Sequence, residues 1–285
     1  MFTTLISAPE LQRLMDTNAQ LMVFDCSFEL MNATAGDAQY EQLHIAGAVR
    51  ADLDRHLSAK GAPEAASGGR HPLPSREAFA AWLGNVGLTK DMQVVVYDRQ
   101  GCNYCGRLWW MLKWLGLEAC AVLDGGLAAW QAQGGAVASG TQPQRQATNY
   151  PLAPALFGLT DTNSVANGLG RPNQTLIDAR SAPRFRGEVE PLDPVAGHIP
   201  GALNRPFADN FDAHGKFKTA DQLRAEFLAL LAGRDPATVV HHCGSGVSAV
   251  PNIIAMAVAG LGPTALYGGS WSEWCSDPTR PMAQG

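Results

Sequence analysis

The sequence lacks several features that whole classes of protein require. Only 16% of its 285 residues are charged, and acidic residues outnumber basic ones, which leaves a formal net charge of −5. A protein that binds nucleic acid usually has a surplus of basic residues, so the composition argues against that class. No apolar run is long enough to cross a bilayer, and we therefore expect no membrane segment.

The sequence also has few cysteines and nothing at its start that resembles a secretory leader. Residues 1–6 contain neither a basic cluster nor a long apolar stretch. Six cysteines in a chain of this length, without such a leader, are typical of free thiols in a reducing compartment. We therefore expect a cytoplasmic protein, and the length of 285 residues predicts two domains with separate hydrophobic cores.

The most informative segment surrounds Cys243. An apolar run at residues 239–242 ends at this cysteine, and Gly-Ser-Gly-Val-Ser follows it before a further apolar stretch that contains Pro251. A strand that turns tightly into a helix gathers backbone N–H groups around one point, and the helix end adds partial positive charge. We therefore expect Cys243 to lose its proton more readily than free cysteine and to act as a nucleophile. The alternative is a buried structural cysteine at a strand end.

Four sequence blocks occur twice in the same order. They are an apolar run that ends in aspartate (21–25 and 175–178), a His-Ile-x-Gly-Ala block (44–48 and 198–202), a second apolar run (94–98 and 239–243) and a glycine-tryptophan block (123–130 and 267–274). This repetition predicts a duplicated domain. Asp98 stands in the first copy where Cys243 stands in the second, so only the second half can perform thiol chemistry at this position.

The alternation of short apolar runs with amphipathic segments predicts an α/β fold. Segments 75–83, 108–115, 221–231 and 251–259 are the expected helices, and two tandem domains, each a mostly parallel sheet flanked by helices, would accommodate them. Ligands bind such sheets beyond the carboxyl ends of the strands, where Cys243 falls. We expect an N-terminal domain at residues 1–138, a linker at 139–154 and a C-terminal catalytic domain at 155–285.

Together these blocks resemble the rhodanese superfamily, specifically its tandem-domain sulfurtransferases, over nearly the whole chain. The resemblance rests on both His-Ile-x-Gly-Ala blocks, on Asp-Ala-Arg at 178–180, on the Cys243 loop and on residues 269–274. The loop is similar to that of the 3-mercaptopyruvate type, which usually has Thr where this chain has Ser248. The resemblance implies two rhodanese-like domains, of which the first is non-catalytic.

The resemblance also implies a two-step sulfur transfer. Cys243 would take the sulfur of 3-mercaptopyruvate as a persulfide, and a thiol, thioredoxin or cyanide would then remove it. The substrate would bind at the loop, where main-chain amides stabilise negative charge, and the loop residues concerned are Gly244, Ser245, Gly246, Val247 and Ser248. The chemistry requires no metal and no cofactor. A monomer is expected, since two domains already enclose a cleft.

The segment after residue 178 contains several arginines, and in the family this segment binds the substrate. Arg184 falls at the substrate-binding arginine, and a guanidinium suits bidentate capture of a carboxylate. Arg186 is a weaker candidate for the same role, and Arg180 is expected to brace the loop, paired with Asp178. The sequence departs from the family at Leu192, where mercaptopyruvate enzymes commonly have a second arginine, and the missing contact would be worth about 2 kcal/mol.

A Ser-His-Asp arrangement has been proposed in the family to handle a proton, and by residue matching its members are Ser245, His71 and Asp54. A histidine that titrates near neutral pH and is oriented by a carboxylate fits general acid–base catalysis. The first domain would then be retained because its loop reaches the cleft. The alternative is that His71 and Asp54 lie in a surface loop without contact to Ser245.

Other functions remain open at this stage. Thiosulfate is the alternative sulfur donor, although no Lys or Arg lies between Gly244 and Leu261. A cysteine phosphatase would need an arginine where Ala249 stands, and a non-catalytic rhodanese-like module fits the first half better than the Cys243 loop. Core packing is the interpretation of His241 and His242, with a metal site as the alternative, and of Trp271 and Trp274, with a wall of the cleft as the alternative. Ser270 and Glu273 have the pattern of a capping box. Cys102 and Cys105 form a structural C-x-x-C, with a redox switch as the alternative.

Overall fold

A computed structural model describes residues 1–17 and 20–285. The chain divides into two compact units. The first unit comprises Met1–Ala59, Pro74–Leu156 and Ala213–Lys216, and the second comprises Lys60–Leu73, Phe157–Asp212 and Phe217–Gly285. Residues 60–73 come from the first half of the sequence and yet pack within the second unit. This exchange brings residues to the Cys243 loop that lie far from it in sequence.

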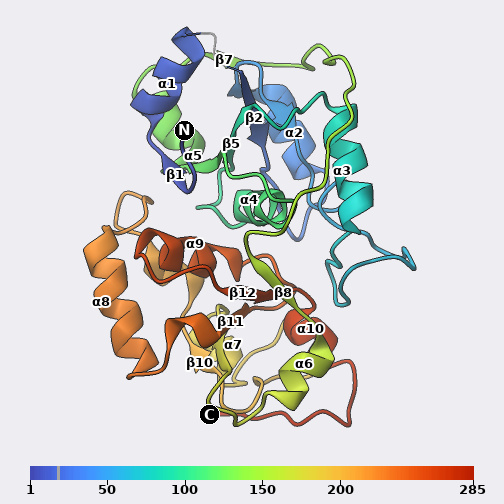
Figure 1. The fold of residues 1–285 in the computed structure, drawn as a ribbon, viewed down its shortest axis with the longest axis vertical. Helices are drawn as coiled ribbons and strands as arrows, with labels where there is room; N and C mark the ends of the chain where they lie inside the picture. The colour runs from blue at the N-terminus through green and yellow to red at the C-terminus, as the bar shows by residue number, and fades with distance from the viewer. Residues whose placement is uncertain (18–19) are drawn as a thin grey trace. The chain divides into compact units, whose positions relative to one another are not determined.

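The first unit is built on a five-stranded parallel sheet (Figure 1). Its strand order is β1-β6-β5-β2-β4, with β1 (Leu5–Ile6), β2 (Leu21–Asp25), β4 (Val49–Arg50), β5 (Gln93–Tyr97) and β6 (Cys120–Leu123). A separate antiparallel pair consists of β3 (His44–Ile45) and β7 (Val137–Ala138). The helices are α1 (Ala8–Asp16), α2 (Ala35–Gln42), α3 (Arg76–Asn85), α4 (Cys105–Trp114) and α5 (Gly126–Ala132).

The second unit repeats this plan. Its parallel strands are β8 (Gly158–Thr160), β9 (Thr175–Asp178), β10 (Leu203–Asn204), β11 (Val239–His242) and β12 (Ala265–Tyr267), in the order β10-β9-β11-β12-β8. The helices are α6 (Thr162–Asn167), α7 (Ala182–Phe185), α8 (Ala220–Leu231), α9 (Val250–Val258) and α10 (Ser270–Trp274), with 3-10 turns η1 (Phe207–Asn210) and η2 (Pro236–Thr238).

The two sheets confirm the predicted duplication. Read from the opposite edge, the second order is β8-β12-β11-β9-β10, which matches β1-β6-β5-β2-β4 strand for strand. Asp98 directly follows the central strand β5 of the first unit, and Cys243 directly follows the central strand β11 of the second. The two residues therefore occupy equivalent positions. α4 packs on β5 and β6 of the first unit, and α9 packs on β11 and β12 of the second (Figure 1).

The repeated histidines occupy equivalent environments. His44 Nδ1 lies 2.7 Å from the Tyr40 carbonyl oxygen, and its ring stacks on that of Tyr40. His198 Nδ1 lies 2.8 Å from the Phe185 carbonyl oxygen, and its ring stacks on that of Phe185. Both imidazoles are buried and held by an aromatic neighbour, so the repeated block has a structural role in each unit.

The expected helices are present, and their ends differ by a few residues. α3 starts one residue after Ser75, because Ser75 is its N-cap and accepts the Ala78 N–H at 3.2 Å. α4 starts at Cys105, three residues before the expected start at 108. Every residue of this helix is buried, so its sequence has no amphipathic pattern that would mark its first turn. No helix in the described part of the chain has the length and apolarity that a bilayer crossing requires.

Residues 139–154, expected to be a linker, contain no helix or strand. Part of this segment is anchored within the first unit beside α3. The Thr148 N–H donates to the Gly84 carbonyl oxygen at 2.8 Å, and the Thr148 hydroxyl donates to the Leu88 carbonyl oxygen at 2.5 Å. A Cβ on Gly84 would lie 2.5 Å from the Thr148 carbonyl oxygen, so the close approach of this segment requires glycine there.

Candidate active site

Cys243 is the first residue after the central strand of the second unit, and only 1% of it is exposed. Its N–H donates to the Ser270 hydroxyl at 3.1 Å, and its carbonyl oxygen accepts the Trp271 N–H at 2.9 Å. The next residue is tied to the same helix, because the Gly244 carbonyl oxygen accepts the Ser272 N–H at 2.9 Å. The start of α10 therefore fixes the main chain on both sides of the sulfur.

The loop after Cys243 closes against the segment that precedes α10. Gly246 has φ +72°, and a Cβ at this position would lie 2.2 Å from the Gly268 carbonyl oxygen. Both the left-handed conformation and the close approach require glycine. α9 begins at Val250 with Pro251 in its first turn, so the loop runs directly into a helix N-terminus, as the sequence predicted.

The first unit shows how an anion is held at this position in the fold. Asp98 accepts four backbone N–H groups through its carboxylate, from Gln100, Cys102, Tyr104 and Cys105, at distances of 2.8–3.0 Å. The aspartate therefore fills the ring of amides with its own side chain.

Four amides of the second unit occupy the equivalent positions after Cys243. Counted from the shared position, they belong to Ser245, Val247, Ala249 and Val250. The Val250 N–H bonds the Val247 carbonyl oxygen, whereas those of Ser245, Val247 and Ala249 donate to no other residue in the described part of the chain. These amides can stabilise negative charge on a sulfur atom at residue 243.

Two of the three residues predicted to handle a proton meet in the second unit. His71 Nδ1 lies 2.8 Å from the Ser245 hydroxyl oxygen, and the two residues are 3% and 6% exposed. His71 therefore does not lie in a surface loop away from Ser245. Asp54 belongs to the first unit, where its N–H donates to the Asp52 carboxylate at 3.0 Å, and its part in the arrangement stays a prediction.

Arg184 lies in α7 and is anchored by two carboxylates. Its Nε and Nη2 atoms donate to Glu190 at 3.2 and 2.6 Å, and Nη2 also lies 3.3 Å from Asp193 Oδ2. Burial acts to raise the pKa of Glu190, but hydrogen bonds from Arg184 and its charge prevail and lower it. Both carboxylates are nearly inaccessible, with side chains 4% and 3% exposed. The guanidinium is therefore held in one orientation.

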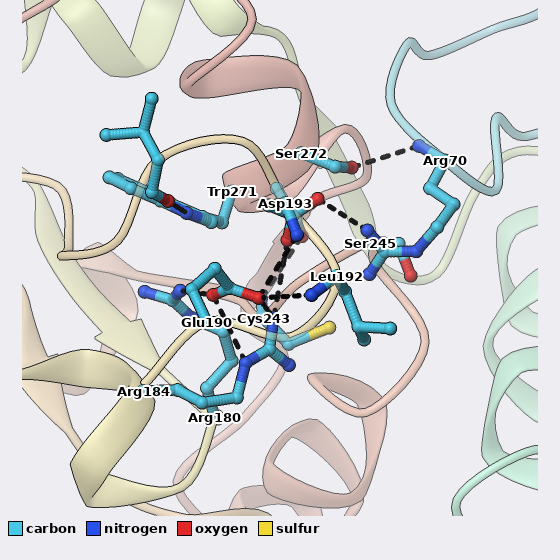
Figure 2. A network of polar contacts seen from close by, with 12 residues as sticks. Arg70, Arg180, Arg184, Glu190, Leu192, Asp193, Cys243, Ser245, Trp271 and Ser272 are labelled. Atoms are coloured by element: carbon cyan, nitrogen blue, oxygen red, sulfur yellow. Dashed lines mark hydrogen bonds and ion pairs between the residues drawn. The ribbon is translucent and has the colours of Figure 1, made fainter. Parts of the chain in front are cut away.

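Arg70 is a site residue that the sequence did not reveal. Its Nη1 donates to Asp193 Oδ1 at 2.5 Å, so Asp193 bridges Arg70 and Arg184 (Figure 2). The two guanidiniums lie over the loop: a methyl group on Gly244 would be 3.1 Å from Arg70 Nη2 and 3.6 Å from both Nη atoms of Arg184. Arg70 stands next to His71 in the sequence, and that adjacency was the only available signal.

The other arginines of this region have separate roles. Arg180, whose side chain is 1% exposed, donates to Asp178, which confirms the expected pair. It also donates to Glu190 and the Gly197 carbonyl oxygen and lies over the Trp271 ring. Arg186 is 43% exposed and pairs with Glu188 at the surface. Its contacts do not place it at the Cys243 loop.

Comparison with known proteins identifies the family. The model of the rhodanese-like domain matches the chain twice, at residues 7–133 and 161–277. The chain belongs to the rhodanese family. It is 46% identical to a Pseudomonas aeruginosa protein named as a probable 3-mercaptopyruvate sulfurtransferase, over 93% of each chain. It is 39% identical to a Mycobacterium tuberculosis protein named provisionally as a thiosulfate sulfurtransferase, over 99% of this chain and 97% of that protein.

The fold agrees with solved rhodanese structures. The 3-mercaptopyruvate sulfurtransferase from Leishmania major superposes with a TM-score of 0.82 and 32% sequence identity, covering 96% of this chain and 74% of that one. The sequence resemblance and the predicted fold of two rhodanese domains are thereby confirmed. The chain is a sulfurtransferase of the rhodanese family, which implies a small sulfur donor and a thiol acceptor.

The start of α10 differs from the expected capping box. The helix begins at Ser270 with Gly269 as its N-cap, so the prediction that Ser270 is the cap was wrong. Ser270 has φ +54°, and its hydroxyl donates to the Tyr267 carbonyl oxygen while it accepts the Cys243 N–H. The hydroxyl is used to position the nucleophile. Trp271 and Trp274 are fully buried and belong to the core.

Cys102 and Cys105 lie in the first rhodanese domain, in its equivalent of the active loop. Both are buried, both are free thiols, and their amides bind the Asp98 carboxylate. Burial raises the pKa of both thiols, which disfavours the thiolate needed for disulfide exchange. These contacts favour the structural interpretation over a redox switch.

His241 provides a prediction on acid stability. It is fully buried on β11, and among the described residues neither ring nitrogen has a hydrogen-bond partner. Burial lowers its pKa to about 3, and the charges of His242 and Arg205 act in the same direction. In the unfolded chain the histidine has a pKa near 6.5 and takes up a proton below that pH, whereas in the folded protein it stays neutral. The free energy of unfolding therefore decreases as the pH falls from about 6.5 toward 3.

We expect this residue alone to lower the free energy of unfolding by about 2 kcal/mol between pH 7 and pH 5. Urea unfolding of the wild type and of His241→Leu at both pH values measures the effect, because leucine has a similar size and no proton to bind. The variant should gain about 2 kcal/mol relative to the wild type as the pH falls. An equal difference at the two pH values would contradict this account.

Proposed function

We propose that this sulfurtransferase moves the sulfur of 3-mercaptopyruvate to a thiol, thioredoxin or cyanide through a persulfide on Cys243. One observation carries the proposal: the guanidinium of Arg184 is fixed over Gly244, directly beside Cys243 and the open amides of its loop. A guanidinium next to the nucleophile suits a donor that carries a carboxylate near its sulfur. The name given to the Pseudomonas aeruginosa relative agrees with this donor.

The first step is a displacement at sulfur. The Cys243 thiolate attacks the thiol sulfur of the donor, an S–S bond forms, and the C–S bond breaks. The electron pair of that bond leaves on carbon as the enolate of pyruvate. The proton of the donor thiol then reaches this carbon, so that the products are a Cys243 persulfide anion and pyruvate. We propose that the loop Gly244, Ser245, Gly246, Val247 and Ser248 binds the substrate. The open amides of Ser245, Val247 and Ala249 would stabilise the negative charge on sulfur throughout.

The proton transfer is assigned to Ser245 and His71. Their 2.8 Å contact gives a hydroxyl group on the loop a neighbouring imidazole that can accept and return a proton. We propose that Ser245 carries the proton from the donor thiol to the enolate carbon, with His71 as its acid–base partner. Asp54 would orient the imidazole, as the sequence match suggests.

The second step regenerates the enzyme. A thiolate or cyanide attacks the outer sulfur of the persulfide, and the Cys243 thiolate leaves. The amides that stabilised the first thiolate stabilise it again as the leaving group. This step needs no metal or cofactor, and we propose none. We further propose that the protein acts as a monomer in the cytoplasm, where its six cysteines would remain reduced.

Thiosulfate is a second candidate donor. The Mycobacterium tuberculosis relative is named for it, and two guanidiniums beside Gly244 would also attract a sulfonate. The absence of Lys and Arg between Gly244 and Leu261 does not count against this donor, since the cations come from other segments.

Mass spectrometry of Cys243 tests the proposal and separates the donors. The reduced protein is exposed to 3-mercaptopyruvate or to thiosulfate, and the peptide that contains Cys243 is analysed. We expect one added sulfur atom with 3-mercaptopyruvate. Steady-state rates with each donor should give a kcat/KM at least tenfold higher for 3-mercaptopyruvate than for thiosulfate, which corresponds to about 1.4 kcal/mol of transition-state stabilisation. Sulfur on a different cysteine, or faster loading from thiosulfate, would contradict the proposal.

A further inference from the structure

We infer that Arg70 is a second substrate-binding arginine, which holds the carboxylate of the sulfur donor together with Arg184. The inference rests on the proposed function, since it names how the donor of that reaction is recognised. Arg70 lies at the end of a segment, Lys60–Leu73, that comes from the first half of the sequence and packs within the second unit.

The main chain around Arg70 is fixed to the active-site loop and to α10. The Arg70 N–H donates to the Ser272 hydroxyl at 2.9 Å, and the next residue, His71, contacts Ser245. Gly69 has φ +82°, and a Cβ there would lie 2.5 Å from the Gly269 carbonyl oxygen. A side chain anchored on both flanks is presented to the loop in a defined position, as carboxylate recognition requires.

The carboxylate of Asp193 holds the guanidiniums of Arg70 and Arg184 close together. Asp193 accepts Arg70 Nη1 on one oxygen and Arg184 Nη2 on the other, and its side chain is only 3% exposed (Figure 2). Two like charges at such proximity repel each other, and the shared aspartate offsets that repulsion. Asp193 thus acts as a positioning residue that makes the pair one unit.

The guanidinium nitrogens that remain are directed at the loop. Arg70 Nη2 and Arg184 Nη1 donate to no residue in the described part of the chain, and Arg70 Nε is buried without a partner. These two Nη atoms are among the three nitrogens within 3.6 Å of the position that a Cβ on Gly244 would take. Open donors from two cations therefore converge beside the residue that follows the nucleophile.

Arg70 can also supply the cation that is missing at Leu192. The sequence departs there from the arginine that the resemblance implied, and the main-chain N–H of Leu192 instead bonds Glu190 Oε1 at 3.1 Å. Arg70 supplies a second guanidinium from another segment of the chain. Glycine at residue 244 keeps the space below both cations open for the carboxylate of a donor whose sulfur reaches Cys243.

Steady-state kinetics of Arg70→Met with two donors test this inference. Methionine keeps much of the length of the side chain and removes the charge. The donors are 3-mercaptopyruvate and mercaptoacetone, which retains the thiol and the ketone and lacks the carboxylate. We expect KM for 3-mercaptopyruvate to rise about 10- to 100-fold with little change in kcat, because a charge-assisted hydrogen bond made before the reaction is lost. The kcat/KM for mercaptoacetone should change less than threefold.

Two further variants make the result specific. Arg70→Lys keeps the charge and the contact with Asp193 but loses the fork, so its KM should lie between those of the wild type and Arg70→Met. Arg186→Met removes an exposed arginine from the same region and should leave both donors unaffected.

Each remaining outcome has a separate meaning. An unchanged KM in Arg70→Met, or an equal loss with both donors, would overturn the inference while the wild type still uses 3-mercaptopyruvate. A wild-type protein that takes no sulfur from 3-mercaptopyruvate would overturn the proposed function and this inference with it.

Discussion

Replacing Cys243 with serine is expected to reduce sulfur transfer by roughly 10⁴-fold or more, because no other group can hold the sulfur between the two half-reactions. A serine hydroxyl is a weak nucleophile toward sulfur and cannot form a persulfide. The fold should persist, since the two hydrogen bonds that anchor residue 243 are made by its main chain. Release of pyruvate from 3-mercaptopyruvate and thiocyanate formation with cyanide are the measurements.

Cys275→Ser is the matched control. Cys275 is a buried free thiol of the same unit, and it lies at the end of α10 rather than in the active-site loop. This variant should retain transfer, which would show that loss in Cys243→Ser does not follow from the removal of any buried thiol. Undiminished transfer in Cys243→Ser, with a normal circular dichroism spectrum, would refute the assignment of the nucleophile.

Disabling the hydroxyl–imidazole pair is expected to have the second largest effect. Ser245→Ala removes the hydroxyl, and His71→Asn keeps a polar atom near Nδ1 that cannot take up a proton near pH 7. Each should lower kcat with 3-mercaptopyruvate by about 10²- to 10³-fold, the range for a lost general acid–base group. The double variant should lose hardly more than either single one, because the two side chains act as a unit.

Thiosulfate serves as the control donor for this pair. Sulfite leaves as a stable anion, so loading from thiosulfate requires no proton on the departing group. We expect His71→Asn to lose less than tenfold in the rate of persulfide formation from thiosulfate. An equal loss with both donors would indicate that His71 only supports the shape of the loop, and additive losses in the double variant would argue against a shared proton.

The fold could be read from the sequence because its signals are local and occur twice. Short apolar runs between helical segments specify a parallel α/β sheet, and four repeated blocks indicate that the sheet is built twice. The position of Cys243 after a central strand also followed from the sequence, since such a loop lies directly at the end of its strand. The start of α10 was misread because a hydroxyl used to hold the Cys243 amide has the same local pattern as a helix cap.

The cations of the site were harder to predict, because their proximity depends on the path of the chain. Arg70 is 173 positions before Cys243 in the sequence, and nothing local marks it as a partner of Arg184. The Cys243 loop itself contains no Lys or Arg, whereas the structure places two guanidiniums over Gly244. Their common link, Asp193, is a loop carboxylate without any recognisable motif.

The duplicated α/β architecture could be predicted from the residues alone, because strand-loop-helix segments fold locally. The same segments predict Cys243 as the nucleophile and a non-catalytic first copy with Asp98 in its place. Which side chains meet beside the Cys243 loop depends instead on how distant segments of the chain pack. Residues 60–73 pack within the second unit, and this exchange brings His71 to Ser245 and Arg70 to Asp193. Contacts across such sequence separations arise from the packing of whole units, which no local pattern encodes.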